Sequence, residues 1–304
     1  MAKNEWKSTT MLIDAAIDIL EQENPMTIRQ LFYRLVSAAV IENCLADYQR
    51  VSKVMTKARE DERVPYEWIV DRSRATYRSS NFRDLKHLGA SLEYACTQYR
   101  RDYWQDQPCH VEIWCEKDAV TGSIEEVREE YGLTVEAQRG FNSTTNVGNV
   151  AGRLLKQQRA GKEVVVFYLG DWDPSGAEIE ADVQRRVIRV AERMDHRGLW
   201  DFTMRRVAIF KDDIAAFHLP PLKVKLADSR APRFVLAHGD QAVELDALPP
   251  TELRARLRKA IDSVIDHAAW DRASIVEEVQ RDTCRRYAGV FKTMMDERTG
   301  STES

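Results

Sequence analysis

Short apolar runs and longer amphipathic segments alternate between residues 110 and 210. The predicted strands cover 110–115, 134–137, 163–169 and 204–210, and the predicted helices cover 118–131, 145–159 and 176–196. This alternation is typical of a parallel, doubly wound sheet. We therefore predict an α/β domain with a C-terminal extension over residues 107–295, followed by a disordered polar tail at 296–304.

Two of the predicted strands end abruptly in carboxylates. Glu116 follows the run 111–115, and Asp171 and Asp173 follow the run 164–169. Buried parallel strands present ligands at their C-terminal edge, and residues two apart in extended chain point the same way. Three carboxylates that converge at one edge repel one another unless a divalent cation lies between them. Because Mg²⁺ binds through a few carboxylates and keeps waters for a phosphate substrate, the sequence predicts a site for Mg²⁺ or Mn²⁺.

These two acidic segments resemble the Toprim domain of topoisomerases, primases and some nucleases. Glu116-Lys117-Asp118-Ala119-Val120 looks like the E-K-x-A-V segment of the topoisomerase VI A subunit and its meiotic double-strand-break relatives. Gly170-Asp171-Trp172-Asp173-Pro174-Ser175-Gly176 is similar to G-D-x-D-P-x-G of the same family. The resemblance implies a Toprim domain, with a Rossmann-like parallel sheet. The alternative is that both segments are solvated turns on an ordinary α/β sheet.

A second motif of this family lies upstream. Residues 27–35, T-I-R-Q-L-F-Y-R-L, are similar to its R-x-[IL]-[FY]-Y motif, so the resemblance implies that Tyr33 is the nucleophile that attacks DNA. Arg29 would then be the arginine one helical turn earlier. The pattern itself indicates a helix capped by Thr27, in which Arg29 and Tyr33 project together because they are four residues apart. The alternative is that Phe32 and Tyr33 only pack within a helix-turn-helix.

Residues 1–80 are predicted to form a helical winged-helix domain. Helices at 9–23 and 47–62 flank the tyrosine helix, and residues 66–71 form a predicted wing strand. Arg50, Lys53 and Lys57 lie on the outer face of the third helix, where we expect them to bind double-stranded DNA. A helix at about 81–103 is predicted to link the domains, over residues 81–106.

The positive charge is concentrated in the first third of the chain, although the net charge is −4. Residues 27–60 carry six Lys or Arg against three acids, and residues 72–101 carry seven against two. This asymmetry favours a phosphate-binding surface on the N-terminal domain. Its alternative is a solvated helix face. The segment 139–145 could also offer amides and hydroxyls to a phosphate, or be an ordinary capped turn.

Composition excludes several other classes. The sequence has neither an apolar stretch of membrane-spanning length nor a signal peptide, which predicts a cytoplasmic, nucleoid-associated protein with no membrane partner. Its five cysteines lack CxxC spacing and favour neither a disulfide framework nor a zinc site. The sequence contains no Walker A motif, so we expect no ATPase within this chain.

Together these features predict a Mg²⁺-dependent enzyme of the type IIB topoisomerase class, similar to the topoisomerase VI A subunit, that cleaves DNA by transesterification. Tyr33 would form a 5′-phosphotyrosyl link, with Glu116, Asp171 and Asp173 holding the metal. In the family, the tyrosine of one protomer acts with the carboxylates of its partner, so the resemblance implies a homodimer. One alternative is a Toprim nuclease that hydrolyses DNA and has a structural Tyr33. Another is a winged-helix DNA-binding protein without catalysis.

Overall fold

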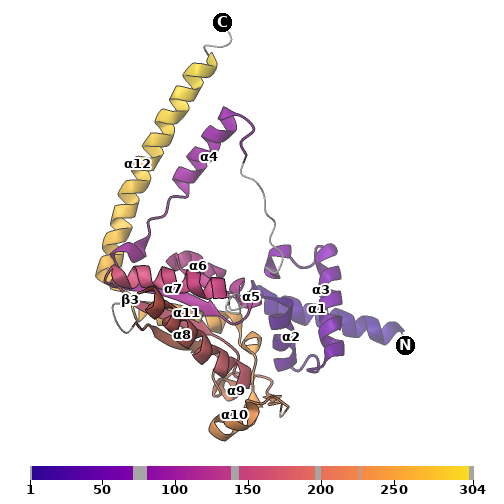
Figure 1. The fold of residues 1–304 in the computed structure, drawn as a ribbon. Coiled ribbons are helices and arrows are strands. Elements are labelled where there is room, and N and C mark those ends of the chain that lie inside the picture. Colours follow the sequence, from indigo (N-terminus) through magenta and orange to yellow (C-terminus); the bar gives the residue numbers. More distant parts are fainter. Residues whose placement is uncertain (1, 71–80, 138–143, 196–199, 226, 301–304) are drawn as a thin grey trace. The chain divides into compact units, whose positions relative to one another are not determined.

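The computed structural model describes residues 2–70, 81–137, 144–195, 200–225 and 227–300, which form two compact units. The first unit comprises Met1–Arg74 and Cys109–Val264, and the second comprises Ala75–Pro108 and Ile265–Ser304. Figure 1 colours the chain by sequence, so that both segments of each unit can be followed. Residues 81–106, which the sequence suggested as a linking segment, thus belong to the same unit as the C-terminal helix.

A four-stranded parallel sheet forms the centre of the first unit and confirms the predicted mixed α/β class. Its strands are β1 (Cys109–Cys115), β2 (Thr134–Ala137), β3 (Glu163–Leu169) and β4 (Thr203–Ala208), in the order β2-β1-β3-β4. Cys115 pairs with Ala137 on one side and with Leu169 on the other. Because β1 and β3 are neighbours that end level, the residues that follow them meet at one edge of the sheet.

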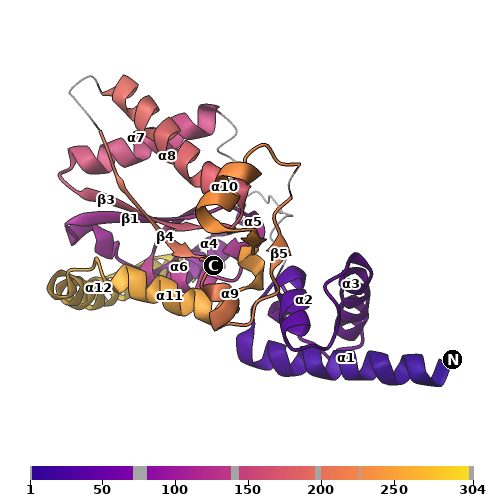
Figure 2. The same ribbon diagram turned by 90° about the horizontal axis from the view of Figure 1, so that it is seen from below.

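Helices cover both faces of this sheet, as Figure 2 shows: α7 and α8 lie on one side, and α6 and α11 on the other. Their bounds are α5 (Asp118–Thr121), α6 (Glu125–Tyr131), α7 (Thr144–Arg159), α8 (Pro174–Met194) and α11 (Pro250–Asp262). Trp114, Val166 and Tyr168 pack under α7 and α8 in one buried cluster. The single helix predicted at 118–131 is divided into α5 and α6 by residues 122–124. Within this break the Ser123 hydroxyl donates a hydrogen bond to the side chain of Gln30.

Three helices precede the sheet: α1 (Ala2–Glu23), α2 (Ile28–Ser37) and α3 (Leu45–Glu60). Thr27 caps α2 as predicted, in a reciprocal capping box with Gln30. The apolar faces of the three helices meet in a small core that includes Leu12, Leu20, Leu31, Leu35, Val51 and Met55, each at most 1% exposed. The predicted helical N-terminal region is thereby confirmed.

The prediction of a strand at 66–71 is wrong for residues 66–70, which the structure describes. Tyr66–Trp68 form a 3-10 turn, η1, which begins after Pro65 and closes with a bond from Trp68 N to Pro65 O of 3.2 Å. Proline's fixed φ suits the start of such a turn. Only Ile69 makes a β-bridge, to Met26, and residue 71 lies outside the described part of the chain.

After β4 the first unit continues through short elements. These are α9 (Asp213–Ala216), β5 (Leu222–Lys223), α10 (Ala231–His238), β6 (Gln241–Ala242) and the 3-10 turn η4 (Leu245–Ala247). β5 and β6 pair antiparallel. Main-chain bonds then join Val243 to Trp172 in both directions, at 2.9 and 3.0 Å, so the segment 243–247 lies beside the turn that follows β3.

The second unit consists of the 3-10 turn η2 (Tyr103–Asp106) and the helices α4 (Leu85–Thr97) and α12 (His267–Gly300). α4 is shorter than predicted because Asp84 caps it, accepting a bond from His87 N at 2.6 Å. α12 ends at Gly300, so this helix includes the first residues of the segment 296–304, for which the sequence predicts disorder. No helix in the described part of the chain is long and apolar enough to cross a membrane.

Candidate active site

The carboxylates predicted to follow β1 and β3 lie against each other. Glu116 N donates to Leu169 O at 2.8 Å, which extends the strand pairing by one residue. The Glu116 side chain accepts a bond from Asp171 N at 2.9 Å. Level ends of neighbouring parallel strands therefore bring Glu116 to the main chain of the acidic turn that carries Asp171.

Asp173 begins the helix that follows the same turn. Its Oδ1 accepts a bond from Gly176 N at 2.6 Å, and Pro174 occupies the first turn of α8. The chain folds back tightly here, since a Cβ on Gly176 would lie 2.4 Å from Asp171 O and 3.2 Å from Glu116 Oε2. The turn thus holds Asp171, Asp173 and Glu116 in one small volume.

Arg206 of β4 fixes the backbone of this turn. One of its nitrogens, Nη1, donates to Gly170 O at 2.9 Å and to Asp171 O at 3.2 Å. The Arg206 guanidinium also forms an ion pair with Glu180 of α8. The central carbon of the guanidinium lies 5.2 Å from the centre of the Tyr168 ring. These contacts hold the loop that carries Asp171 onto the end of the sheet.

Two of the predicted ligands, Glu116 and Asp171, have raised pKa values. Burial, reinforced by the charges of Asp171 and Asp173, raises the pKa of Glu116 to about 7. Burial also raises the pKa of Asp171, although Lys117 and a bond from Leu245 N act in the opposite direction. A cation at this position would favour the ionised form of both side chains.

Two further acids belong to this site although the sequence indicated no role for them. Glu244 and Asp246 flank the start of η4 and face Lys117, whose Nζ lies 2.8 Å from Asp171, 3.2 Å from Glu244 and 3.3 Å from Asp246. Burial alone would lower the pKa of Lys117, but the three carboxylates have the larger effect and raise this pKa. The only sequence signal was a second pair of acids two residues apart, before Pro249-Pro250.

Arg29 links the tyrosine helix to the same group of acids. It binds the Glu244 carboxylate through two nitrogens, with Nε to Oε2 at 2.8 Å and Nη2 to Oε1 at 2.6 Å. As predicted for residues four apart, Arg29 lies beside Tyr33, with its guanidinium carbon 5.8 Å from the ring centre. The candidate nucleophile therefore adjoins the acidic site of its own chain.

Tyr33 is held in a protonated state. The residue is only 5% exposed, and its ring contacts that of Phe32 with the centres 5.3 Å apart. Burial and the charge of Glu244 raise the pKa of Tyr33 to about 12, and Arg29 acts against them. Ionisation of this hydroxyl is therefore opposed first by burial and then by the charge of Glu244.

The donor chemistry at Glu116 and Asp171 fits Mg²⁺, since both offer carboxylate oxygens and both have raised pKa values. In the structure, however, the side chains are not arranged as the ligands of one metal ion. In the parts of the chain that the structure describes, no three His, Cys, Asp or Glu side chains are placed to hold a metal. Asp173 caps α8 and the Lys117 ammonium contacts Asp171, so metal binding would require both interactions to rearrange.

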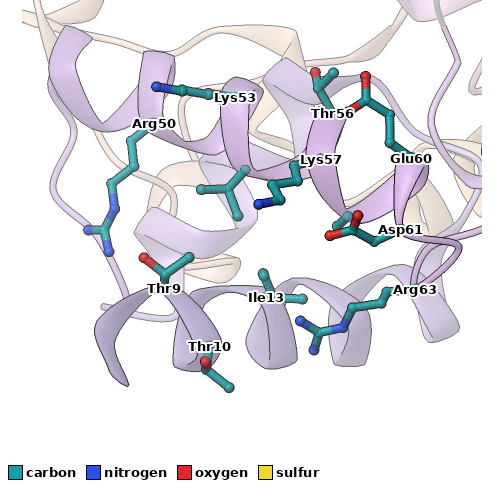
Figure 3. Close-up of a pocket in the computed structure, with 12 residues that line it drawn as sticks. Thr9, Thr10, Ile13, Arg50, Lys53, Thr56, Lys57, Glu60, Asp61 and Arg63 are labelled. Carbon is teal, nitrogen blue, oxygen red and sulfur yellow. The ribbon is translucent and has the colours of Figure 1, made fainter. Parts of the chain in front are cut away.

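A basic groove lies between α1 and α3 (Figure 3). The predicted DNA-binding residues Arg50, Lys53 and Lys57 all line it, with Lys53 and Lys57 exposed. Its lining also includes Thr9 and Thr10 of α1, Thr56 of α3 and Arg63, which follows α3; the sequence indicated no role for these residues. Glu60 and Asp61 lie at its acidic end. Most of the candidate phosphate segment 139–145 lies outside the described residues.

Comparison with models of protein families, with curated proteins and with solved structures found no match to this chain.

Proposed function

We propose that this protein is a divalent-cation-dependent DNA-cleaving enzyme similar to the topoisomerase VI A subunit, with an N-terminal DNA-binding module and a Toprim domain. The observation that carries the proposal is the convergence of Glu116 and Asp171 at adjacent strand ends, with the pKa of each raised by burial. The tyrosine motif adjoins this site through Arg29 and Glu244. Perturbed acids at the carboxyl edge of a parallel sheet are typical of a functional site.

The proposed reaction is a transesterification at phosphorus. The Tyr33 oxygen forms a bond to the phosphorus, the bond from phosphorus to the 3′-oxygen breaks, and the 3′-oxygen takes up a proton as the phenolic proton passes to water. Arg29 stabilises the phenolate and the charge on the phosphate oxygens. A cation held by Glu116, Asp171 and Asp173 would neutralise charge on the scissile phosphate or the leaving oxygen.

Arg29 would hold the DNA phosphate beside the tyrosine in this scheme. Arg29 is 44% exposed at its side chain and bound to Glu244, so a phosphate that reaches this point can replace the Glu244 carboxylate. The guanidinium carbon of Arg29 lies 5.8 Å from the centre of the Tyr33 ring. Transfer of Arg29 from Glu244 to the phosphate would therefore bring the scissile phosphate close to Tyr33.

The groove between α1 and α3 supports the proposed DNA contact. Arg50, Lys53 and Lys57 would bind successive phosphates, while Thr9 and Thr10 of α1 are on the other side of the groove, where Thr9 points toward α3. We propose that two copies of the chain act together on a duplex, each cutting one strand, without an ATPase in this chain.

A denaturing gel with labelled duplex tests the proposal directly. Wild-type protein with Mg²⁺ should leave protein covalently attached to 5′ ends, whereas Tyr33→Phe should bind DNA normally and form no adduct. Asp171→Asn should also form none, because the acidic site is incomplete. Matched cleavage by wild type and Asp171→Asn would remove the acidic site from the mechanism.

One observation favours a second candidate, a hydrolytic nuclease that uses the same acidic site. Tyr33 is buried, packs against Phe32 and has a pKa of about 12, as expected of a structural tyrosine. In that case Tyr33→Phe keeps the ring packing and should cut as fast as wild type, while Asp171→Asn should still abolish cleavage. The two variants together separate covalent from hydrolytic cleavage.

A further inference from the structure

We propose that one face of α12 binds the same face of a second copy of this chain, with the two helices antiparallel. This outer stripe of α12 consists of Val276, Val279, Thr283, Tyr287 and Val290. The proposed function requires two copies of the chain but assigns no contact between them. The outer stripe supplies such a contact without depending on any step of the DNA chemistry.

The two helices of the second unit bury few side chains against each other. α4 runs alongside α12 (Figure 1), yet no residue of α4 is buried. Among residues 267–293 of α12, whose side chains the structure describes, only Ala269, Ala273 and Glu277 are buried. Isolated helices shorter than about 12–15 residues are marginal in water, and most helices in proteins are stabilised by packing an apolar face. The 13 residues of α4 and their partner α12 therefore leave apolar surface that a further helix can cover.

The outer stripe is apolar and exposed. Val276, Val279, Tyr287 and Val290 are 41, 64, 70 and 56% exposed, respectively. Thr283 lies between them and is also exposed. At 3.6 residues per turn, these five residues fall within an arc of about 80° on the helix. They therefore form one continuous face that is wide enough to pack against a helix.

This face is separate from the side of α12 that contacts α4. The hydroxyl of Tyr99, which follows α4, donates to Gln280 Oε1 at 2.8 Å. A Cβ on Gly89 of α4 would lie 3.8 Å from the Phe291 ring. Gln280 and Phe291 thus mark the side toward α4, and the centre of the outer stripe is turned about 70° away from them. A helix can therefore pack on the outer stripe while α4 keeps its place.

The spacing of the stripe is the same in both directions along the helix. Val276 and Val290 each lie seven residues from Thr283, and Val279 and Tyr287 each lie four residues from it. Two antiparallel copies that cross at Thr283 therefore place Val276 beside the partner's Val290, and Val279 beside the partner's Tyr287. A two-fold contact requires a surface that is complementary to itself in this way, whereas a contact with an unrelated helix does not.

The charges beside the stripe suit the same two-fold axis. Asp282 and Arg286 lie along one edge of it, 2.7 Å apart and 54 and 80% exposed. Along the helix axis Asp282 lies about 1.5 Å before Thr283, and Arg286 about 4.5 Å after it. A two-fold axis at Thr283 brings identical edges together and reverses these offsets. Asp282 then lies about 3 Å along the axis from the partner's Arg286, so opposite charges meet on the edge of the contact.

Cysteine crosslinking of the full chain locates the contact. Thr283→Cys is made in a chain in which Cys44, Cys96 and Cys284, the cysteines that are not buried, are replaced by serine. We expect a short bismaleimide to link two copies of this variant, because residue 283 lies on the two-fold axis. Arg285→Cys, on the opposite side of α12, is the matched control and should give a dimer yield about tenfold lower. Equal yields from the two variants would overturn the proposal.

Val276→Cys and Val290→Cys, in the same serine background, determine the direction of the helices. In the antiparallel contact Val276 lies about 21 Å along the axis from the partner's Val276 but beside the partner's Val290. Co-expression of the two variants should therefore give crosslinked dimer, whereas either variant alone should give almost none. Efficient crosslinking of either variant with itself would show a parallel contact and contradict the proposal.

A charge placed in the stripe tests whether its apolar side chains bind the second copy. Val279→Asp should lower the dimer yield of Thr283→Cys about tenfold, because a carboxylate would lie in an apolar contact. Val279 is 64% exposed, so this variant should keep the circular dichroism spectrum of its parent. Leu236→Asp on α10 replaces a leucine that is 90% exposed and should leave the yield unchanged. An equal yield from Val279→Asp and Leu236→Asp would show that the stripe does not hold the copies together.

Sedimentation velocity of the wild-type chain, without DNA or divalent cations, completes the test. We expect a dimer that dissociates on dilution and that the Val279→Asp variant forms more weakly. A wild-type dimer that gives no crosslink at residue 283 would pair through another surface, and a monomer would have no such contact. Either result overturns the proposal, while the proposed cleavage is decided by its own assay for covalent adducts.

Discussion

At the scale of single residues, ionisation of the Glu116 carboxylate destabilises the fold. Its carboxylate is buried beside Asp171 and Asp173, which raises its pKa from the ordinary 4.5 to about 7. Between pH 4.5 and 7 the unfolded chain releases this proton while the folded chain retains it, so stability falls as the pH rises. Above pH 7 the folded protein carries the full cost of the ionised group.

Glu116→Gln should therefore stabilise the protein above pH 7 in the absence of divalent cations. The amide oxygen can still accept the bond from Asp171 N, whereas the charge is removed. We expect a gain of about 2 kcal/mol at pH 8 and almost none at pH 4. Thermal unfolding with EDTA checks this. Added Mg²⁺ should raise the Tm of wild type more than that of the variant, and equal shifts would argue against a cation at Glu116.

At the scale of elements, a buried acid joins a strand of the sheet to a helix. Glu112 of β1 is fully buried and binds Arg153 of α7 at 2.8 and 3.0 Å, as well as Trp114 Nε1 at 3.0 Å. Burial alone would raise its pKa, but contacts with His110, Arg153 and Trp114 outweigh burial and lower it to about 2. The ionised form therefore stabilises the packing of α7 on β1.

This depressed pKa predicts a specific loss of stability in acid. The contribution of Glu112 is present above pH 4.5 and lost as the pH falls toward 2, since the unfolded chain takes up the proton first. Its size should be about 3 kcal/mol, visible in urea unfolding between pH 5 and 2.5. Glu112→Gln should be less stable at pH 7 and have a flatter profile in acid, while Glu129→Gln, on the exposed side of α6, should match wild type.

The proposed role of α3 can be tested through the dependence of DNA affinity on salt concentration. If its lysines contact phosphates, Lys53→Gln with Lys57→Gln should reduce the slope of log affinity against log salt concentration by about 2 units. Lys259→Gln on α11 removes an exposed lysine far along the chain and should leave the slope unchanged. Fluorescence anisotropy with labelled duplex measures both, and an unchanged slope in the double variant would show that α3 makes no phosphate contacts.

At the scale of the whole molecule, Arg254 joins the helical region to the sheet domain of the first unit. Burial lowers its pKa, and its guanidinium satisfies carbonyls from residues 23, 24 and 123. Arg254→Met keeps most of the apolar stem but leaves these carbonyls without that donor, so it should cost about 2–4 kcal/mol. Urea unfolding measures the loss.

Hydrogen exchange gives the local readout for the same variant. We expect amides of α2 to lose protection before those of β1 and β3 in Arg254→Met. Arg258→Met, whose pairs with Glu126 and Glu130 are more exposed, is the control and should change stability by less than about 1 kcal/mol. Equal protection of α2 in both variants would contradict the tethering role of Arg254.

Sequence patterns predicted the sheet well because each strand is a short apolar run with polar limits. The bounds of 134–137 and 163–169 match β2 and β3. The wing strand failed because Pro65 starts a 3-10 turn, a local effect that alternation of side chains does not report. Glu244 and Asp246 were missed because they reach the site only through the pairing of Val243 with Trp172, a contact between residues 71 apart in sequence. No local pattern encodes such a contact.

The turn between β3 and α8 restricts how this chain can diverge. A Cβ at Gly176 would lie 2.4 Å from a main-chain oxygen, and one at Gly170 would lie 2.5 Å from the Tyr168 ring. At 176 the added Cβ would clash with backbone, and at 170 it would clash with a ring that packs under Arg206. Neither group can move aside without a loss of stability. Descendants of this sequence can change Glu116, Asp171 and Tyr33 more easily than they can change these two glycines. Lineages without the proposed activity should still carry both.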